Sequence, residues 1–142
     1  MQRNDFRILV VDDERDWVTV NRKALERRGY TVCGASDAEE AVSLVQEHPC
    51  HLAFLDVDMP GTDGIELIDM LREHVPDIEV IMLTGYGTAD TYSAAKIKGI
   101  TDFLEKMGSA GDRILSDEMA DCADEVFERK CSSNPNTHGV ME

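Results

Sequence analysis

Four apolar runs of this sequence lead into side chains that could take part in chemistry: Asp12 with Asp13, Asp56, Thr84 and Lys106. Two unit charges about 4 Å apart interact by about 4 kcal/mol at an effective dielectric near 20, so carboxylates gathered in one place repel each other. A hard divalent cation removes that repulsion, and oxygen ligands suit Mg²⁺ with several retained waters. With a metal and a lysine to neutralise phosphoryl oxygens, one carboxylate can act as the nucleophile. The residue types therefore indicate phosphoryl transfer to an aspartate.

Each of these residues also has a simpler explanation when it is taken singly. An Asp at the end of a strand usually forms a turn or caps a helix, and Asp13 could merely cap the helix that follows. Thr84 precedes Gly85 and could be a turn residue, while a lone lysine is most often a solvated charge. Because four strand ends all carry the residue type that the same chemistry needs, coincidence is the weaker explanation.

The segments that must position these side chains alternate between two kinds. Short apolar runs predict strands, and they lie at 6–11, 30–35, 51–56, 78–84 and 100–106. Helical spacing of apolar residues predicts the helices that follow them, at 14–29, 37–47, 65–74, 88–98 and 112–130. Ser36 and Glu39 predict a capping box at the start of the second helix.

Five alternating strand–helix units indicate an α/β fold, a doubly wound five-stranded parallel sheet with helices on both faces. In such sheets ligands bind outside the carboxyl ends of the strands. With the flavodoxin-like (βα)5 strand order 2-1-3-4-5, the side chains at the ends of the first, third, fourth and fifth strands reach one pocket. The length of 142 residues fits one domain, which we place at 1–130, and 131–142 is interpreted as a polar tail or the start of a linker.

The charge and cysteine content of the chain exclude some classes of protein. A net charge of −15 at pH 7 argues against direct binding to nucleic acid, which needs clustered Lys and Arg, and against anionic membrane surfaces. No apolar run approaches membrane-spanning length. Basic residues gather at 15–28, where a solvated helix face is favoured and a docking surface for an acidic partner is the alternative. The four cysteines lack CxxC spacing and indicate reduced thiols, so we expect a cytoplasmic location.

Four motifs, in this order and spacing, resemble the receiver domain of two-component response regulators over about residues 6–130: "VVDDE" (10–14), "FLDVDMPGTDG" (54–64), "IMLTGYG" (81–87) and "DFLEK" (102–106). The resemblance implies that Asp56 is phosphorylated by a sensor histidine kinase or a histidine phosphotransfer protein. It implies a Mg²⁺ site whose protein ligands are Asp12, Asp13, Asp56 and the main-chain carbonyl of Asp58. Thr84 and Lys106 would then contact the phosphoryl group.

The resemblance also implies a switch, with Phe103 in the position of the aromatic switch residue. Phosphorylation adds charge and acceptor oxygens, which draw Thr84 toward them and leave space for Phe103 to rotate inward. This biases the face built from the fourth helix, the fifth strand and the fifth helix toward partner binding, with a homodimer as one possibility. We expect the output to come from a separate protein or a further C-terminal domain. Met107 stands where the family usually has proline after the lysine.

An enzyme is the rival interpretation from another class. "LDVDMP" fits the Asp-x-Asp motif of haloacid-dehalogenase-like phosphatases, with Asp56 as nucleophile and Asp58 as acid/base, and "GDRILSD" mimics their downstream acidic motif. That class has no need for Asp12 and Asp13 on the first strand, so the receiver is favoured. A degenerate receiver is disfavoured because the acidic, threonine and lysine positions are all filled. We therefore expect a signalling phosphoacceptor that assists its own phosphorylation and dephosphorylation, rather than a turnover enzyme.

Overall fold

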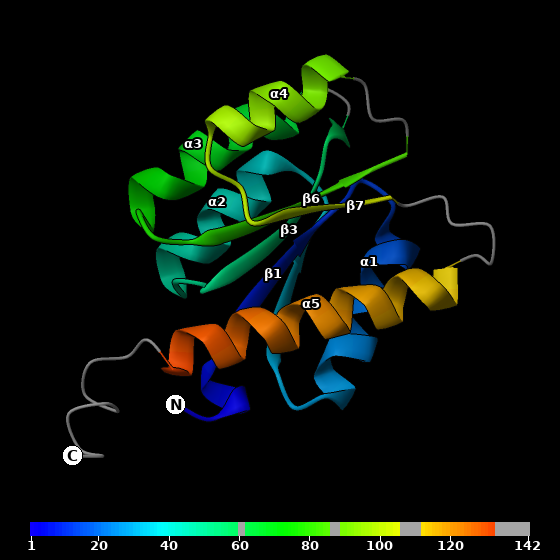
Figure 1. Cartoon of the computed structure of the whole chain (residues 1–142), viewed down its shortest axis with the longest axis vertical. Helices are drawn as coiled ribbons and strands as arrows, with labels where there is room; N and C mark the ends of the chain where they lie inside the picture. Colours follow the sequence, from blue (N-terminus) through cyan, green and yellow to red (C-terminus); the bar gives the residue numbers. More distant parts are fainter. Residues whose placement is uncertain (60–61, 86–88, 106–111, 133–142) are drawn as a thin grey trace.

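The computed structural model describes residues 1–59, 62–85, 89–105 and 112–132. Strands and helices alternate along this part of the chain (Figure 1). The strands of the main sheet are β1 (Arg7–Val11), β2 (Thr31–Ala35), β3 (Leu52–Asp56), β6 (Glu79–Thr84) and β7 (Asp102–Glu105). The α-helices are α1 (Arg15–Arg27), α2 (Ala38–Glu47), α3 (Gly64–His74), α4 (Ala89–Ile97) and α5 (Asp112–Ser132). A short 3-10 helix, η1 (Arg3–Asp5), precedes β1.

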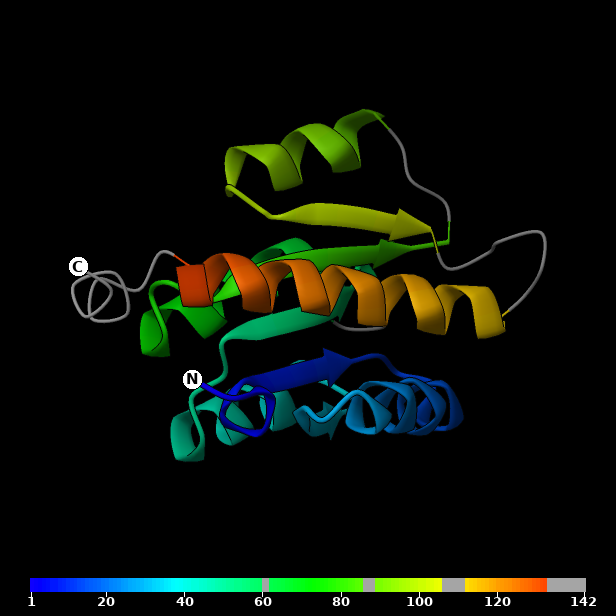
Figure 2. The ribbon, with the colours of Figure 1, turned by 60° about the horizontal axis from the view of Figure 1, so that its bottom comes forward.

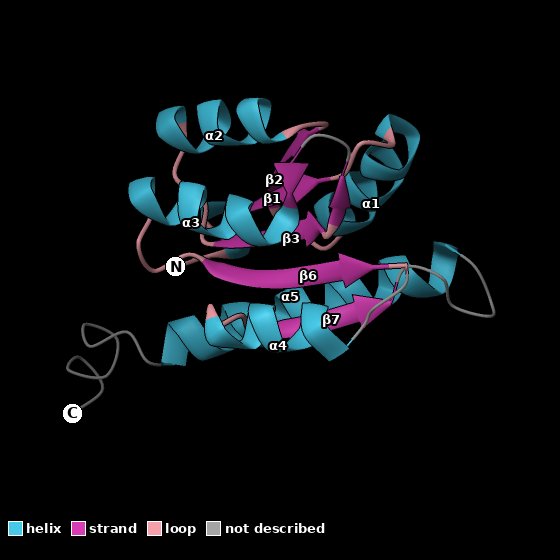
Figure 3. Cartoon of the chain, turned by 90° about the horizontal axis from the view of Figure 1, so that it is seen from above, coloured by secondary structure: helices cyan, strands magenta, loops and turns pink. Residues whose placement is uncertain are grey.

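The five main strands form one parallel sheet in the order β2-β1-β3-β6-β7, which can be followed across Figure 3. Numbered by strand–helix unit, this is the predicted order 2-1-3-4-5, so the predicted fold class is confirmed. A second, two-stranded antiparallel piece, β4 (Asp58–Met59) with β5 (Thr62–Asp63), lies in the segment that the sequence indicated only as a turn.

Helices cover both faces of the sheet and enclose two apolar clusters. One cluster joins the sheet to α2, α3 and Ala95 of α4, and the other joins it to α1 and α5. Figure 2 shows α5, in orange, lying across the sheet. All five residues of β3 are buried because this central strand is covered on both faces, and such burial explains its unbroken apolar run. No helix in the described part of the chain is long and apolar enough to cross a membrane.

The start of α2 differs from the prediction by one residue. Asp37 is the N-cap, and its carboxylate accepts a hydrogen bond from the main-chain N–H of Glu40 at 2.7 Å. The Glu40 carboxylate in turn accepts from the main-chain N–H of Ser36 at 2.7 Å. The predicted capping box of Ser36 with Glu39 is therefore wrong, although an acidic residue three positions after the cap does support this helix start.

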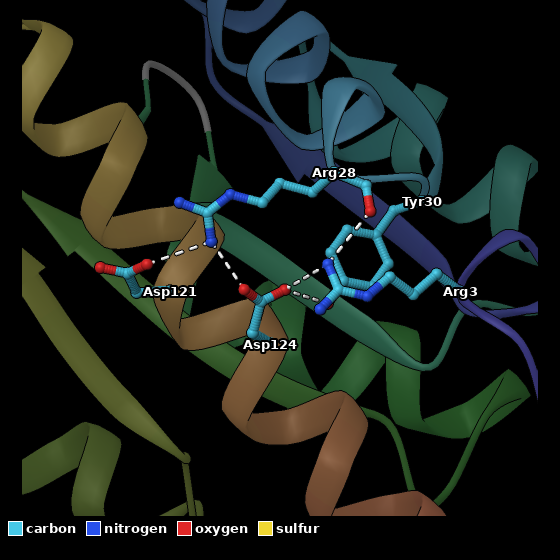
Figure 4. A network of polar contacts seen from close by, with 5 residues as sticks. All are labelled: Arg3, Arg28, Tyr30, Asp121 and Asp124. Carbon is cyan, nitrogen blue, oxygen red and sulfur yellow. Dashed lines mark hydrogen bonds and ion pairs between the residues drawn. The ribbon is translucent and has the colours of Figure 1, made fainter.

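A polar network fixes α5 against α1, η1 and the start of β2 (Figure 4). The Asp124 carboxylate accepts hydrogen bonds from Arg28 at 2.6 Å and from the Tyr30 hydroxyl at 2.5 Å, and Arg3 lies 2.9 Å from it. Arg28 also reaches Asp121 at 3.1 Å. Burial, together with the hydrogen bond to Asp124, raises the pKa of Tyr30, which stays a neutral donor. The network thus holds three separate chain segments on one helix.

Helix α3 begins in close contact with the end of β3, and only glycine fits there. A Cβ atom at Gly64 would lie 2.5 Å from the main-chain oxygen of Asp56 and 2.9 Å from the Cα of Val57. Both atoms belong to the backbone and cannot rotate away. Gly64 therefore allows the turn that follows Asp56 to fold back against the strand.

We predict that Gly64→Ala destabilises the protein by about 1–3 kcal/mol, because the added methyl group overpacks against backbone. The gain in helix propensity from alanine, about 1 kcal/mol, opposes this and is outweighed by the clash. Urea unfolding followed by circular dichroism measures the difference. Glu73→Ala, at an exposed position of the same helix, is the control and should stay within about 0.5 kcal/mol of the unchanged protein. Equal unfolding midpoints for Gly64→Ala and the unchanged protein would contradict the close contact.

A half-buried histidine, His51, lies at the amino-terminal edge of the sheet, and we expect it to make the stability of this edge depend on pH. The main-chain N–H of Arg7 donates to Nδ1 of His51 at 3.0 Å, and the ring stacks on Phe6 with centroids 5.1 Å apart. Burial lowers the pKa of His51, and the Lys130 charge acts in the same direction. Protonation would also remove the acceptor that Arg7 uses.

Because the folded-state pKa is the lower one, the unfolded chain takes up the proton first as the pH falls. We predict that the free energy of unfolding is highest above about pH 6.5, the ordinary pKa of histidine, and declines below it. Urea titrations at about pH 7.5 and pH 5.5 measure the decline, and His51→Asn should make it shallower. His74→Asn, at an exposed histidine, should leave it unchanged. An unaltered decline in His51→Asn would show that other groups cause it.

Candidate functional site

Three carboxylates meet at the carboxyl ends of β1 and β3. One carboxylate oxygen from each of Asp12, Asp13 and Asp56 lies within 4.8 Å of the others. Asp12 is fully buried, Asp56 is 3% exposed and Asp13 is exposed. Carboxylates at this spacing repel each other, and two of them have little water to screen the repulsion. The cluster therefore has the donor type and the charge that a hard divalent cation needs.

The parallel pairing of β1 with β3 brings these acids together. Val11 pairs with Leu55, so Asp12 and Asp56 are the next residues along two neighbouring strands. The main-chain N–H of Asp12 donates to the carbonyl of Ala35 on β2 at 3.1 Å, which holds the residue beyond the end of its own strand. The strand order thus explains why acids 44 positions apart in the sequence share one site.

The main chain at Glu14 also contributes to this arrangement, and it was not among the site residues predicted from the sequence. The main-chain N–H of Glu14 donates to Oδ1 of Asp12 at 2.9 Å and orients the carboxylate. A main-chain donor carries no signature in the sequence, because any residue but proline supplies one.

Thr84 ends β6, the strand beside β3. Leu83 pairs with Asp56, which places Thr84 one position beyond that pair at the same edge of the sheet. The Thr84 side chain is 1% exposed, and its Oγ1 has no hydrogen-bond partner in the described part of the chain. A buried hydroxyl without a partner costs about 1–3 kcal/mol, which makes it suited to an oxygen atom that arrives from outside.

Of the remaining predicted site residues, Phe103 and the backbone of Asp58 lie in the described part of the chain, and Lys106 does not. Phe103 lies in β7, pairs with Met82 and packs half-buried against the apolar cluster shared with α3. The backbone of Asp58 forms β4, where it pairs with Asp63. Lys106 and Met107 lie outside the described residues, so the lysine's place in the site and the peptide bond between these two residues stay predictions.

Comparisons with known proteins identify the family of this chain. The family model described as "Response regulator receiver domain" matches residues 8–115. The nitrogen assimilation regulatory protein NtrX of Azorhizobium caulinodans is 35% identical over 136 residues, which cover 92% of this chain and 30% of that protein. The photosynthetic apparatus regulatory protein RegA of Cereibacter sphaeroides is 33% identical over 108 residues, covering 76% of this chain and 59% of that protein. This chain therefore spans between about a third and three fifths of the length of these relatives.

Solved structures give the same result. The receiver domain of NtrX from Brucella abortus superposes with a TM-score of 0.73 at 31% identity, over 85% of this chain and 98% of that one. A response regulator protein from Burkholderia pseudomallei, solved with a phosphorylated aspartic acid, a calcium ion and citrate, gives a TM-score of 0.70 at 28% identity. That match covers 92% of this chain and 75% of the other.

The alternative of a haloacid-dehalogenase-like phosphatase is not supported. Its Asp-x-Asp interpretation leaves Asp12 and Asp13 without a role, whereas both lie in one cluster with Asp56. The family model describes receiver domains, and the relatives, both the curated proteins and the solved structures, are receivers or proteins that contain one. The chain therefore belongs to the response regulator receiver domains, the signalling domains of two-component systems.

Proposed function

We propose that Asp56 accepts a phosphoryl group from a phosphohistidine donor, which is either a sensor histidine kinase or a histidine phosphotransfer protein. The observation that carries the proposal is the position of Asp56, buried at the end of β3 with oxygens of Asp12 and Asp13 within 4.8 Å. In the transfer, an Asp56 oxygen bonds to phosphorus as the bond from phosphorus to the histidine nitrogen breaks, and the imidazole leaves with the electron pair. Receiver family membership supports this direction of transfer.

The donor set of the site fits Mg²⁺. Asp12, Asp13 and Asp56 offer only carboxylate oxygens, and the main-chain carbonyl of Asp58 would complete the protein ligands. When bound, Mg²⁺ supplies positive charge that offsets the repulsion among the carboxylates and the phosphoryl oxygens. The Burkholderia response regulator, which holds a calcium ion together with a phosphorylated aspartic acid, supports a divalent cation at this place.

Thr84 and Lys106 would bind the transferred group. The Thr84 hydroxyl, which lacks a partner among the described residues, donates to a phosphoryl oxygen. Lys106 follows β7 in the sequence and contributes a second positive charge, which stabilises the developing negative charge on the phosphoryl oxygens. Through these groups the domain assists both the gain and the loss of its own phosphoryl group, and it acts as a signalling phosphoacceptor.

Phe103 would relay the change at Thr84 to the surface. Side chains two positions apart on a strand point to the same face, so Thr84 and Met82 share a face of β6. Met82 pairs with Phe103, and both belong to the apolar cluster on the α3 side of the sheet. Movement of Thr84 toward a phosphoryl group therefore opens space on the face that Phe103 packs against. The α4–β7–α5 face is the surface through which we propose that a partner, or a second copy, binds.

The remaining assignments concern the wider protein. We place the receiver domain at 1–130 and a tail or linker at 131–142, with the output in a separate protein or a further C-terminal domain. The net charge of −15 argues against direct contact of these residues with nucleic acid. A cytoplasmic location follows from the proposed donor and from reduced cysteines.

We predict that incubation with Mg²⁺ and acetyl phosphate gives one adduct about 80 Da heavier, the mass of one phosphoryl group. Intact-mass spectrometry measures the adduct. Asp56→Asn removes the nucleophile and should abolish it, and omission of Mg²⁺ should suppress it. Asp69→Asn, an exposed aspartate on α3, is the matched control and should be phosphorylated like the unchanged protein. An adduct that persists in Asp56→Asn, or its absence from the folded unchanged protein, would overturn the proposal.

We predict that Thr84→Val leaves the unphosphorylated protein as stable as before, or more stable by up to about 1–3 kcal/mol, because a buried hydroxyl without a partner is replaced by a methyl group. The same change should slow phosphorylation, since it removes a donor to the phosphoryl oxygens. Urea unfolding and the rate of adduct formation measure the two effects.

Thr31→Val is the contrasting variant, because the Thr31 hydroxyl donates to the carbonyl of Asn4 at 2.7 Å. Its loss should cost about 0.5–1.5 kcal/mol and leave the phosphorylation rate unchanged. If Thr84→Val destabilised the protein by as much and phosphorylated at the normal rate, Thr84 would have a structural role instead.

A further inference from the structure

A polar cavity lies near the acidic site, between α1, the end of β2 and the start of α2. Its volume is about 150 Å³. The volume per molecule in liquid water is about 30 Å³, so the cavity is large enough for a phosphate ion or a short carboxylate. Its walls include Arg15 and Arg22 from α1, Ser36 from the end of β2 and Glu40 from α2. None of these residues belongs to the proposed phosphorylation site.

The cavity walls are firmly held. A Cβ atom at Gly34, another lining residue, would lie 2.6 Å from Cγ1 of Val18, so α1 packs directly on β2 at this point. Ala35, the next residue along β2, accepts a hydrogen bond at 3.1 Å from the main-chain N–H of Asp12. The cavity and the acidic cluster therefore share a wall made of paired strands, and a ligand would meet a preformed surface.

The positive charges at the cavity exceed those that its own acid can neutralise. Arg15 and Arg22 are two helical turns apart on α1 and line the same cavity. The one acidic residue among the lining residues is Glu40, whose Oε1 already accepts hydrogen bonds from the N–H and the hydroxyl of Ser36, at 2.7 and 3.1 Å. Among the described residues Arg15 has no ion pair. Arg22 forms an ion pair with Glu26, which does not line the cavity. In the described part of the chain, no hydrogen bond or ion pair joins either guanidinium group to a residue that lines the cavity.

Arg22 carries the clearest sign of a missing acceptor. Its Nε is out of contact with water and has no hydrogen-bond partner within the described residues. Glu26 lies 3.8 Å from this nitrogen, which is beyond hydrogen-bond distance. Only one other buried side-chain nitrogen or oxygen in the described part of the chain lacks a partner, and it is Oγ1 of Thr84 at the acidic site. A buried N–H group without a partner is commonly explained by a bound water molecule or ion.

We propose that this cavity binds a small oxyanion, held by the guanidinium groups of Arg15 and Arg22. Guanidinium groups match phosphate and carboxylate oxygens with pairs of charge-assisted hydrogen bonds, and an anion in the cavity would give the Arg22 side chain the acceptor that it lacks. The two possible ligand chemistries are an inorganic phosphate and a simple carboxylate. The size of the cavity and the two guanidinium groups favour phosphate, which offers more acceptor oxygens.

The test follows the Arg22 Nε–Hε signal and the amides of Gly34 and Ala35 by NMR during titration with inorganic phosphate. Divalent cations are left out and the ionic strength is held constant with chloride. We expect saturable shifts at these three places, with a dissociation constant in the millimolar range. Arg22→Gln and Arg15→Gln should each weaken binding at least about tenfold. Acetate in place of phosphate measures binding of a simple carboxylate.

Two control variants distinguish this cavity from the phosphorylation site and from general charge effects. Lys23→Gln removes one positive charge from an exposed position next to Arg22 and should leave phosphate binding unchanged. Asp56→Asn disables the proposed phosphoacceptor and should not weaken phosphate binding. Arg22→Lys keeps the charge without the paired donors and should bind phosphate more weakly than the unchanged protein.

Three outcomes would overturn the proposal. The first is the absence of saturable shifts at the Arg22 Nε–Hε group. The second is equal phosphate affinity in Arg22→Gln and the unchanged protein. The third is loss of binding in Asp56→Asn, which would assign the phosphate to the acidic site. Because the titration needs neither Mg²⁺ nor phosphorylation, these outcomes do not depend on the proposed function.

Discussion

The mutual repulsion of Asp12, Asp13 and Asp56 is the constraint on which the arrangement of this domain depends. Three carboxylate oxygens within 4.8 Å of one another repel each other. They stay together only where the backbone prevents their separation or a cation offsets the repulsion. The parallel register of β1 and β3 prevents the separation, because both strands are buried and hydrogen-bonded on both sides. The apolar interior therefore supports a charge arrangement that is useful only when a cation and a phosphoryl group can reach it.

The two sides of the sheet resist movement to different degrees. On one side, α5 is tied to α1 by the Asp124 network at its carboxyl half and by the Ser116 hydroxyl, which donates to the buried Asn21 side chain at 2.6 Å. On the other side, Ala95 is the one fully buried side chain of α4 among those described, and Ile97 is 84% exposed. Among the side chains that the structure describes, α4 therefore contributes fewer buried contacts than α5. A signal that begins at Thr84 and Phe103, as we propose, would therefore meet less resistance at α4 than at α5.

The sequence was sufficient for the fold and for the acidic cluster because both depend on patterns that repeat. Buried strands leave apolar runs, and the polar residues that end them must meet once the strands are parallel. The start of α2 was missed for a related reason. Ser36 with Glu39 and Asp37 with Glu40 have the same spacing, so the pattern fits two starting points one residue apart. The structure has the second, with the Glu40 N–H donating to Asp37, and the spacing alone does not tell the two apart.

The cavity at Arg15 and Arg22 was beyond prediction for a different reason. A run of basic residues on a helix usually forms a solvated face, and its spacing does not tell which of them lie against another element. The structure separates them, since Arg22 is half-buried and lines the cavity between α1, β2 and α2, whereas Lys23 is exposed. Whether a donor has a hydrogen-bond partner depends on the tertiary structure. Only the relative positions of α1, β2 and α2 reveal that Nε of Arg22 has no acceptor.

Arg15 connects the two polar regions of the domain. It lines the anion cavity with Arg22, and it also lines a more open hollow with Asp13 and Asp16. An anion that engages Arg15 cancels positive charge close to the acidic cluster, which makes a cation there more favourable. Linkage requires the converse, that a cation held by Asp12, Asp13 and Asp56 favours the anion by the same factor. With both sites filled as proposed, the charge of Arg15 would couple anion binding in the cavity to cation binding at the acidic cluster.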